Sequence, residues 1–323
     1  MGMKPQDFLR KDVETQLSER YIVAGAMCSL STNCEHVLEA ARESFLPLES
    51  ALILVDFSVR FWVDPDDPRL PPWPKPYVRG LSHLVYAGFD TGSSMLADLR
   101  TRRVIGRFSA AMAADTTYWK TVIFPMLLTI VGASVGIAEL HCACVAKEEN
   151  GVLLAGPSGS GKSTLALALS QTGFGFVSDD RTFCSLDKDE VHAWGLPTRL
   201  KLRREAAVWF QELRNGHPTN AEACEPDLWL QPERLLLNRV RRCRPRLLIF
   251  LERQGTSEFR LSRMLSGEAW NRLDKDLMAE LPEAVAKRSG TIAKLVESPC
   301  WFLQYNGEPH TIARKIVEHI ARS

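Results

Sequence analysis

The chain has 323 residues, which is enough for two domains or for one domain with a large extension. Its apolar fraction of 45% and its charged fraction of 24% are those of an ordinary globular protein. The net charge of +1 gives no global electrostatic bias toward nucleic acids or membrane surfaces, so any basic patch has to be local.

The N-terminal part is predicted to mix helices and strands. In chain order we expect a polar helix over residues 6–20, a strand over Tyr21–Leu30, a helix over Cys34–Phe45 and a β-prone segment over Ala51–Val63. Thr32 and Asn33 offer capping side chains just before the second helix. The six prolines between Pro65 and Pro76 predict a loop.

Three more strands and a helical region follow. The strands are expected over Leu81–Phe89, Ser94–Leu99 and Arg103–Phe108, and helix over residues 110–140, broken near Pro125 or the glycines. Residues Thr121–Ala138 carry no charge and nearly reach the length of a membrane span. Because this stretch contains proline, glycines and hydroxyls and leads into a strand, we interpret it as a buried helix and expect no membrane partner.

From Cys142 onward the pattern becomes that of an α/β domain. The expected strands and helices are Cys142–Ala146, Val152–Ala155, a helix over Lys162–Gln171, Gly175–Val177, a hairpin of Thr182–Leu186 with Val191–Trp194, Leu247–Leu251 and a terminal helix over Ile312–Ile320. We therefore predict an N-terminal α+β domain of unknown role over residues 1–120 and a catalytic domain over residues 121–323.

The eight cysteines show no metal-binding or disulfide pattern. None forms a Cys-x-x-Cys pair, and no compact Cys/His cluster indicates zinc. The first residues lack the apolar core of a signal peptide. We expect a cytoplasmic protein whose thiols are mostly buried and free.

One motif carries specific chemistry. Residues 156–163 read Gly-Pro-Ser-Gly-Ser-Gly-Lys-Ser and satisfy G-x-x-x-x-G-K-[ST], between a strand-like and a helix-like segment. Glycines let successive N–H groups point at phosphate oxygens, and the helix that follows adds its positive end. ATP is the expected cofactor, with Lys162 on its β- and γ-phosphates and the Ser163 hydroxyl on Mg²⁺. The predicted cofactor-binding residues are Gly156, Pro157, Ser158, Gly159, Ser160, Gly161, Lys162, Ser163 and Thr164.

Two acids and a histidine accompany this motif. Asp179 and Asp180 end the strand-like segment that follows the motif's helix, where a second acid can help to hold the metal. His141 stands at the start of the strand that precedes the motif. A lone histidine is more often structural than catalytic, and an acidic pair can also be a solvated turn.

The three segments together resemble the catalytic domain of the bacterial HPr kinase/phosphorylase family, in particular its shorter homologues found in peptide-biosynthesis gene clusters. The matching residues are His141-Cys-Ala-Cys-Val, the glycine motif with the residues before it, and Gly173-Phe-Gly-Phe-Val-Ser-Asp-Asp180. The resemblance covers about residues 135–255 and does not extend to the first 120. It implies an α/β fold of the P-loop mixed-sheet type, related to phosphoenolpyruvate carboxykinase, and transfer of the γ-phosphoryl group to a serine hydroxyl.

The same resemblance implies roles for individual residues. Asp179 would be the base that orients the acceptor hydroxyl, and Asp180 would support the metal and contact His141. Lys162 would stabilise charge on the transferring group. One signature departs from the family: its acidic Glu-Ile-Arg-Gly-like segment corresponds here to His192-Ala-Trp-Gly195, with Glu190 close but out of register. A reverse phosphorylase reaction and a hexamer are therefore not carried over, and a homo-oligomer stays open.

Two arginine-rich stretches and one acidic strand end have alternative interpretations. Either stretch could supply an arginine to the γ-phosphate, bind an acidic acceptor or form an exposed charged face. The first comprises Arg199, Lys201, Arg203 and Arg204, and the second Arg239, Arg241, Arg242, Arg244 and Arg246. Base-stacking aromatics are not interleaved with them, so nucleic acid is not an expected partner. Glu252 ends the Leu247–Leu251 strand and is read first as part of the core, second as an ATPase acid.

The sequence thus predicts an ATP- and Mg²⁺-dependent kinase whose partner is a hydroxyl-bearing peptide, protein or small molecule. A nucleotide-gated binding module without phosphoryl transfer is the first alternative, and a simple ATPase is the second. Both alternatives keep the glycine motif, and both differ from the kinase in that no phosphoryl group passes to an acceptor.

Overall fold

The computed structural model describes residues 14–49, 54–65, 69–210, 213, 227–230, 235, 237–255, 259–273 and 281–322. The chain forms two compact units, Met1–Val135 and Gly136–Ser323. This division differs from the predicted boundary at 120/121. The apolar segment after residue 116 packs in the first unit, where the Trp119 ring lies 5.5 Å from the Phe61 ring and the Phe124 ring 4.8 Å from the Phe45 ring, measured between centroids.

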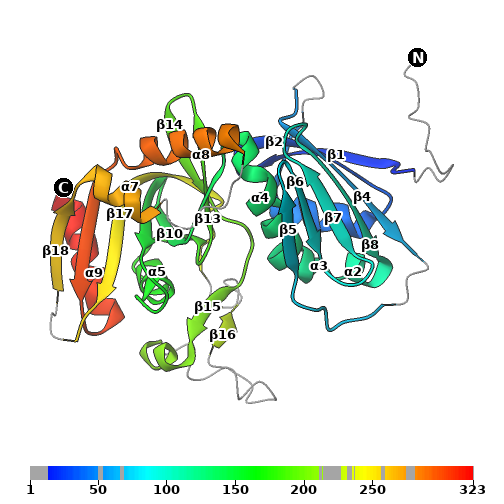
Figure 1. The fold of residues 1–323 in the computed structure, drawn as a ribbon. Coiled ribbons are helices and arrows are strands. Elements are labelled where there is room, and N and C mark those ends of the chain that lie inside the picture. Colours follow the sequence, from blue (N-terminus) through cyan, green and yellow to red (C-terminus); the bar gives the residue numbers. More distant parts are fainter. Residues whose placement is uncertain are drawn as a thin grey trace. The chain divides into compact units, whose positions relative to one another are not determined.

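The first unit is built on an eight-stranded mixed sheet. Its strand order is β3-β1-β2-β4-β8-β7-β6-β5, with β2, β4 and β8 mutually parallel (Figure 1). Inward and outward residues alternate along β4, as in a sheet with one covered face. The strands are β1 (Leu17–Val23), β2 (Ala26–Thr32), β3 (Leu46–Pro47), β4 (Phe57–Asp64), β5 (Tyr77–Leu81), β6 (Leu84–Gly88), β7 (Ser94–Asp98) and β8 (Arg103–Ser109).

Two predictions at the start of this unit are wrong. The helix expected over residues 6–20 lies partly outside the described residues, and Leu17–Arg20 belongs to β1 instead. The strand expected over Tyr21–Leu30 is a hairpin, because Ala24 and Gly25 take positive φ and turn β1 back onto β2. Pairing with β2 and β3 outweighs the local helix preference of the polar residues.

A helical layer covers the buried face of this sheet. Its members are α1 (Glu35–Ser44), α2 (Ala110–Ala114), α3 (Thr116–Tyr118), the π-turn η1 (Trp119–Ile123), α4 (Phe124–Val131) and the 3₁₀ turn η2 (Gly132–Val135). The predicted helix over 110–140 is therefore broken into pieces, and its last residues are a strand. By length and composition alone the run Thr116–Val135 could cross a membrane, but 61% of its apolar 18-residue window is buried within the protein, as in a core helix.

The second unit is built on a nine-stranded mixed sheet. Its main path runs β12-β10-β11-β17-β14-β13-β9, and β19 joins β17 and carries β18. The strands are β9 (Ala138–Leu140), β10 (Cys142–Lys147), β11 (Asn150–Ala155), β12 (Gly175–Ser178), β13 (Thr182–Asp187), β14 (Glu190–Trp194), β17 (Arg242–Arg253), β18 (Phe259–Met264) and β19 (Cys300–Tyr305). The predicted strands from Cys142 to Leu251 are all present, including the β13–β14 hairpin.

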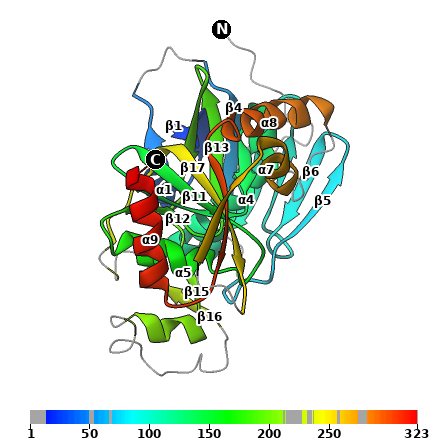
Figure 2. The ribbon, with the colours of Figure 1, turned by 90° about the vertical axis from the view of Figure 1, so that its left-hand side faces the viewer.

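Helices cover both faces of the second sheet. On one face α5 (Lys162–Ser170) lies beside α9 (Pro309–Arg322), as Figures 1 and 2 show. A second apolar core, on the other face, includes residues of α7 (Ser266–Leu273) and α8 (Pro282–Leu295). A separate two-stranded ribbon pairs β15 (Leu200–Arg203) with β16 (Asp227–Leu230), and the 3₁₀ segment η3 (Arg204–Trp209) follows β15.

Several thiols are buried in this second unit. Cys142, Cys144, Cys184 and Cys243 are at most 2% exposed, and the Sγ atoms of Cys144 and Cys243 lie 3.6 Å apart. Burial raises the pKa of Cys142 to about 12 and that of Cys184 well above its ordinary value. The seven cysteines in the described residues are all free, as expected from the sequence; Cys224 lies outside the described residues.

The mixed α/β character predicted from the sequence is confirmed. The strand directions also fix where a site can form. Strand β10 is antiparallel to both β11 and β12, while β17 and β19 are parallel to β11. The carboxyl ends of β12, β11, β17 and β19 therefore meet at one edge of the sheet, where α/β proteins place their ligands.

Candidate functional site

The glycine turn follows the end of β11 at this edge and leads into α5. Gly156, Gly159 and Gly161 have φ values of 149°, 83° and 95°, which L-residues rarely adopt. A Cβ at Gly156 would lie 2.7 Å from the Leu251 carbonyl oxygen, so the turn also packs against β17. The sequence motif therefore forms a strand–turn–helix in which backbone N–H groups and the helix N-terminus face one cavity.

Lys162 is the first residue of α5 and is only 6% exposed. Its Nζ donates to the carbonyl oxygen of Gly156 at 2.8 Å and to that of Pro157 at 3.3 Å. The side chain thus folds back over the turn, and its ammonium group lies at the cavity floor rather than in bulk solvent. A cation held there is directed at whatever anion the turn binds.

Asp179 directly follows β12 and is 2% exposed. Its Oδ2 accepts the backbone N–H of Lys201 at 2.7 Å, whereas Oδ1 has no hydrogen-bond partner of normal geometry among the described residues. Burial raises the pKa of Asp179 to about 6; the Ser163 hydroxyl, the Lys201 N–H and the charge of Lys162 oppose this rise, and the charge of Asp180 adds to it. A buried oxygen without a partner is costly, which indicates a site made for a ligand or a metal.

Asp180 and His141 form a pair beside Asp179. His141 lies between β9 and β10, and its Nδ1 is 3.4 Å from Oδ1 of Asp180. The two side chains are about half exposed and both line the cavity. The structure therefore brings together all four residues for which the sequence predicts a catalytic role.

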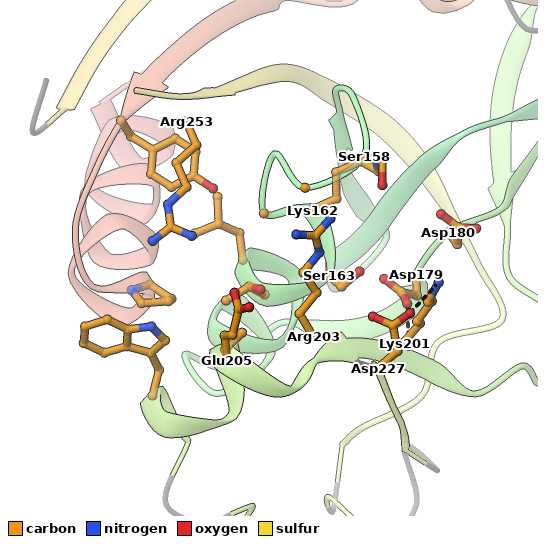
Figure 3. Close-up of a pocket in the computed structure, with 18 of the residues that line it drawn as sticks. Ser158, Lys162, Ser163, Asp179, Asp180, Lys201, Arg203, Glu205, Asp227 and Arg253 are labelled. Carbon is orange, nitrogen blue, oxygen red and sulfur yellow. Dashed lines mark hydrogen bonds and ion pairs between the residues drawn. The ribbon is translucent and has the colours of Figure 1, made fainter. Parts of the chain in front are cut away.

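The β15–β16 ribbon forms the opposite wall. Lys201 Nζ lies 2.9 Å from Asp227 Oδ2, and the Arg203 guanidinium approaches the glycine turn, 3.3 Å from the position that a Cβ of Gly159 would occupy. Figure 3 shows Arg203 projecting into the space between Lys162 and Ser163 on one side and the ribbon on the other. Of the two arginine-rich stretches, the first therefore faces the cavity.

The wall nearest α9 comes from the ends of β17 and β19. Arg253 and Tyr305 are register partners there, and the Tyr305 hydroxyl donates to the Ser160 carbonyl oxygen at 2.6 Å. Burial raises the pKa of Tyr305 to about 12, so the hydroxyl keeps its proton and remains a donor at neutral pH. This bond ties β19 to the glycine turn.

These walls enclose a cavity of about 410 Å³, within the range of small-molecule sites. The sequence predicted nine of its lining residues, which are His141, Ser158, Gly159, Gly161, Lys162, Ser163, Thr164, Asp179 and Asp180. It missed those contributed by distant elements, which include Glu205, Trp209, Asp227, Arg253, Tyr305 and Pro309. Gly156, Pro157 and Ser160 shape the turn without lining the cavity.

The other acids considered from the sequence are engaged elsewhere. Glu252 Oε2 accepts from Gln304 Nε2 at 2.8 Å and also from Gln254 Nε2, as expected for a strand residue of the core. Glu190 Oε2 lies 3.3 Å from Arg244 Nε. Burial lowers the pKa of His192, the first residue of the divergent signature, and neither Glu190 nor His192 lines the cavity.

The cavity can accommodate a magnesium ion that is held mainly by the oxygens of a bound ligand. Within the described parts of the chain, no three His, Cys, Asp or Glu side chains converge into a protein-only metal cage. Mg²⁺ is usually held by one or two carboxylates together with phosphate oxygens and waters. The Ser163 hydroxyl and the carboxylates of Asp180 and Asp179 supply oxygens of the required kind at the cavity, although Oδ1 of Asp179 is itself buried.

Comparisons with known proteins give a structural likeness but no match in sequence. No protein-family model matches the chain, and no curated protein matches its sequence. Among solved structures, the HPr(Ser) kinase/phosphatase from Coxiella burnetii aligns with a TM-score of 0.31 and 15% identity, over 57% of this chain and 97% of that one. A likeness at this level assigns no function, so the proposal below rests on the geometry of the site.

Proposed function

We propose that the second unit binds a nucleoside triphosphate with Mg²⁺ and transfers its γ-phosphoryl group to a hydroxyl of a peptide, protein or small molecule. The observation that carries the proposal is the Asp179 carboxylate, which is buried in the same cavity as Lys162 and the glycine turn and has one oxygen without a partner. A nucleotide pocket alone does not require a buried acid at that place.

Binding of the triphosphate is assigned to residues 156–164. The turn supplies backbone N–H groups and α5 its N-terminal partial charge, while the ammonium group of Lys162 neutralises the phosphate oxygens. Arg203 reaches the same turn from the ribbon and is the arginine that we assign to the γ-phosphate. Its planar guanidinium can donate two parallel hydrogen bonds to phosphate oxygens.

The metal site is assigned to Ser163 and Asp180. These residues would hold Mg²⁺, which would neutralise the negative charge that develops on the phosphates. The chain's own part is to hold two oxygens at the cavity wall and to keep Asp180 next to His141, whose Nδ1 lies 3.4 Å from its Oδ1. His141 then orients this carboxylate.

Asp179 is assigned the role of the base. Its pKa of about 6 keeps it mostly ionised at pH 7, yet closer to neutrality than an ordinary carboxylate, which suits a general base. The Asp179 carboxylate would accept the hydrogen of the acceptor hydroxyl and receive that proton as the new O–P bond forms. The bond between the γ-phosphorus and its bridging oxygen breaks at the same time, and the diphosphate leaves with the electron pair.

The experiment is to incubate the full chain with γ-labelled ATP, Mg²⁺ and candidate acceptors, and to identify the product by mass spectrometry. Lys162→Ala and Asp179→Asn should each lower the transfer rate by a factor on the order of 10² to 10³, as for the loss of one preorganised group. Glu252→Gln serves as a matched acidic control outside the cavity. Wild-type transfer activity in Asp179→Asn would remove the role assigned to that residue.

The same experiment discriminates the alternatives. Steady phosphate release that does not depend on an acceptor identifies a simple ATPase. Tight nucleotide binding without turnover, combined with nucleotide-dependent capture of a partner, identifies a binding module, and it is the divergent His192–Gly195 signature that motivates this second reading.

A further inference from the structure

The cavity has an end that the phosphoryl-transfer chemistry does not use. In Figure 3, Asp179, Asp180, Lys201 and Asp227 lie on one side of Lys162, and Arg253 lies on the other. The three aspartates mark the end where the γ-phosphoryl group would react, while Glu205 lies on the other side of Arg203. A triphosphate lying over the glycine turn therefore extends its nucleoside toward Arg253.

Several contacts tie residues together at this second end. Arg253 is the register partner of Tyr305, after which the chain passes through Gly307 and Pro309 into α9. Trp209 is the last residue of η3, on the wall opposite to Arg253 and Tyr305. The ring of the next residue, Phe210, lies 5.2 Å from the ring of His310, and this contact brings Trp209 close to Pro309. Trp209 and Pro309 both line the cavity and thus face one space.

The chemistry of this end differs from that of the acidic end. Trp209 keeps 39% of its surface exposed, although an indole is among the most favourable side chains to bury. Ala206 and Leu165 add apolar surface, and Arg253 adds a planar cation. An exposed flat aromatic ring, an apolar rim and a guanidinium group are suited to a flat aromatic ligand that is joined to a phosphate chain.

We propose that Trp209, Pro309 and Arg253 form the nucleoside-binding end of the site, where a nucleobase stacks on the Trp209 ring and Arg253 contacts the ribose or the α-phosphate. This proposal rests on the proposed function, because the glycine turn sets the direction of the triphosphate. Stacking recognises the face of a base rather than its edges, so the site accepts ATP and GTP with similar affinity.

The test measures binding of three probes to the full chain by calorimetry in the presence of Mg²⁺: ATP, GTP and inorganic tripolyphosphate, which has the phosphates but no nucleoside. The wild-type protein should bind ATP and GTP more tightly than tripolyphosphate by about 5-fold to about 150-fold, the range expected for one stacked base. Trp209→Ala should remove most of that difference and leave tripolyphosphate binding unchanged. Trp209→Phe should retain most of it, since a benzene ring still stacks.

Tyr77→Ala is the control, because Tyr77 is an exposed aromatic residue of β5 in the first unit and does not line the cavity. Its binding of all three probes should equal that of the wild type. The proposal is overturned if the wild type binds tripolyphosphate as tightly as ATP, or if Trp209→Ala weakens both probes equally. Lys162→Ala separates the proposed triphosphate site from the proposed nucleoside end. If Lys162→Ala leaves the affinities for all three probes unchanged, the triphosphate site itself is wrong. If Lys162→Ala weakens all three affinities but Trp209→Ala changes none of them, only the nucleoside end is overturned.

Discussion

The backbone N–H of Lys201 donates to Oδ2 of Asp179 at 2.7 Å, so the β15–β16 ribbon holds one oxygen of the buried carboxylate. A main-chain donor survives every substitution of its own residue except proline. What can be changed is the ion pair that fastens the ribbon, in which Lys201 Nζ lies 2.9 Å from Asp227 Oδ2. The position of the proposed base therefore depends on two strands that are separate from the main sheet.

Asp227→Ala should lower the rate of phosphoryl transfer while leaving nucleotide affinity nearly unchanged. The pair is partly exposed, so its contribution is at most about 1 kcal/mol, or about a 5-fold effect. Lys201→Ala keeps the N–H and removes the same ion pair. The double variant should then be no slower than either single variant, as single-turnover rates in a double-mutant cycle would show. Fully additive losses would mean that the two residues act independently.

The transfer rate should rise with pH and level off above about pH 6. Burial raises the pKa of Asp179 to about 6, and a base acts only in its ionised form. Below that value the rate should fall about tenfold for each pH unit, because the ionised fraction does. A pH–rate profile at saturating nucleotide measures this. A flat profile from pH 5 to pH 8 would contradict the assignment of Asp179 as the base.

Asp179→Asn should stabilise the unliganded second unit at pH 8. The pKa of Asp179 is raised to about 6 in the folded protein, so the folded state prefers the protonated acid. The stability that this preference contributes is fully present below the unfolded pKa of about 4. It is lost as the pH rises through about 6. Above that pH the buried charge costs about 3 kcal/mol, which the neutral amide avoids. Thermal unfolding at pH 8 and at pH 4 should show a gain that shrinks at the lower pH. An equal gain at both values would show that charge burial is not its cause.

Gly161→Ala should impair nucleotide binding for two reasons that can be separated. The residue has a φ of 95°, and a Cβ there would overlap the Tyr305 hydroxyl that donates to Ser160. Left-handed backbone costs a non-glycine residue about 1–2 kcal/mol, and the overlap adds to that cost. Tyr305→Phe removes the hydroxyl, so the double variant should recover part of the loss, as calorimetry with ATP would measure. If the double variant binds no better than Gly161→Ala, the overlap contributes nothing.

Glu252→Gln should leave both nucleotide binding and turnover within about 2-fold of the wild type. Its carboxylate accepts from Gln254 and Gln304 at the end of β17 and does not line the cavity. Steady-state rates over a range of Mg²⁺ concentrations provide the measurement. A marked rise in the Mg²⁺ requirement would move Glu252 into the metal site and would favour the ATPase reading.

The local features of the site could be predicted from the sequence. The strand–turn–helix around Lys162 follows from glycine spacing and apolar runs, and the proximity of Asp179 follows from a strand that ends one helix later. The β13–β14 hairpin could be predicted for the same reason, since its strands are close in sequence. In each case the information lies in residues that are close to one another in the sequence.

The parts that were missed depend on contacts between distant segments. Asp227 reaches the cavity only because β16 pairs with β15, and Tyr305 only because β19 is parallel to β17. Neither residue lies in a motif. The polar segment before Tyr21 has helix-like composition, yet Leu17–Arg20 forms a strand because it completes a hairpin with β2. These outcomes depend on pairing between strands, which a local sequence pattern does not show.

The reactivity of the buried thiols in the second unit can be used to measure how often this unit opens. Because burial raises the pKa of Cys142, Cys144 and Cys184, these groups are protonated and shielded at neutral pH and should react slowly with alkylating agents. Labelling then has to wait for the sheet to separate, and its rate follows the local opening equilibrium. Any small molecule that slows this labelling binds the closed form, so the native cysteines allow ligands to be screened before an acceptor is known.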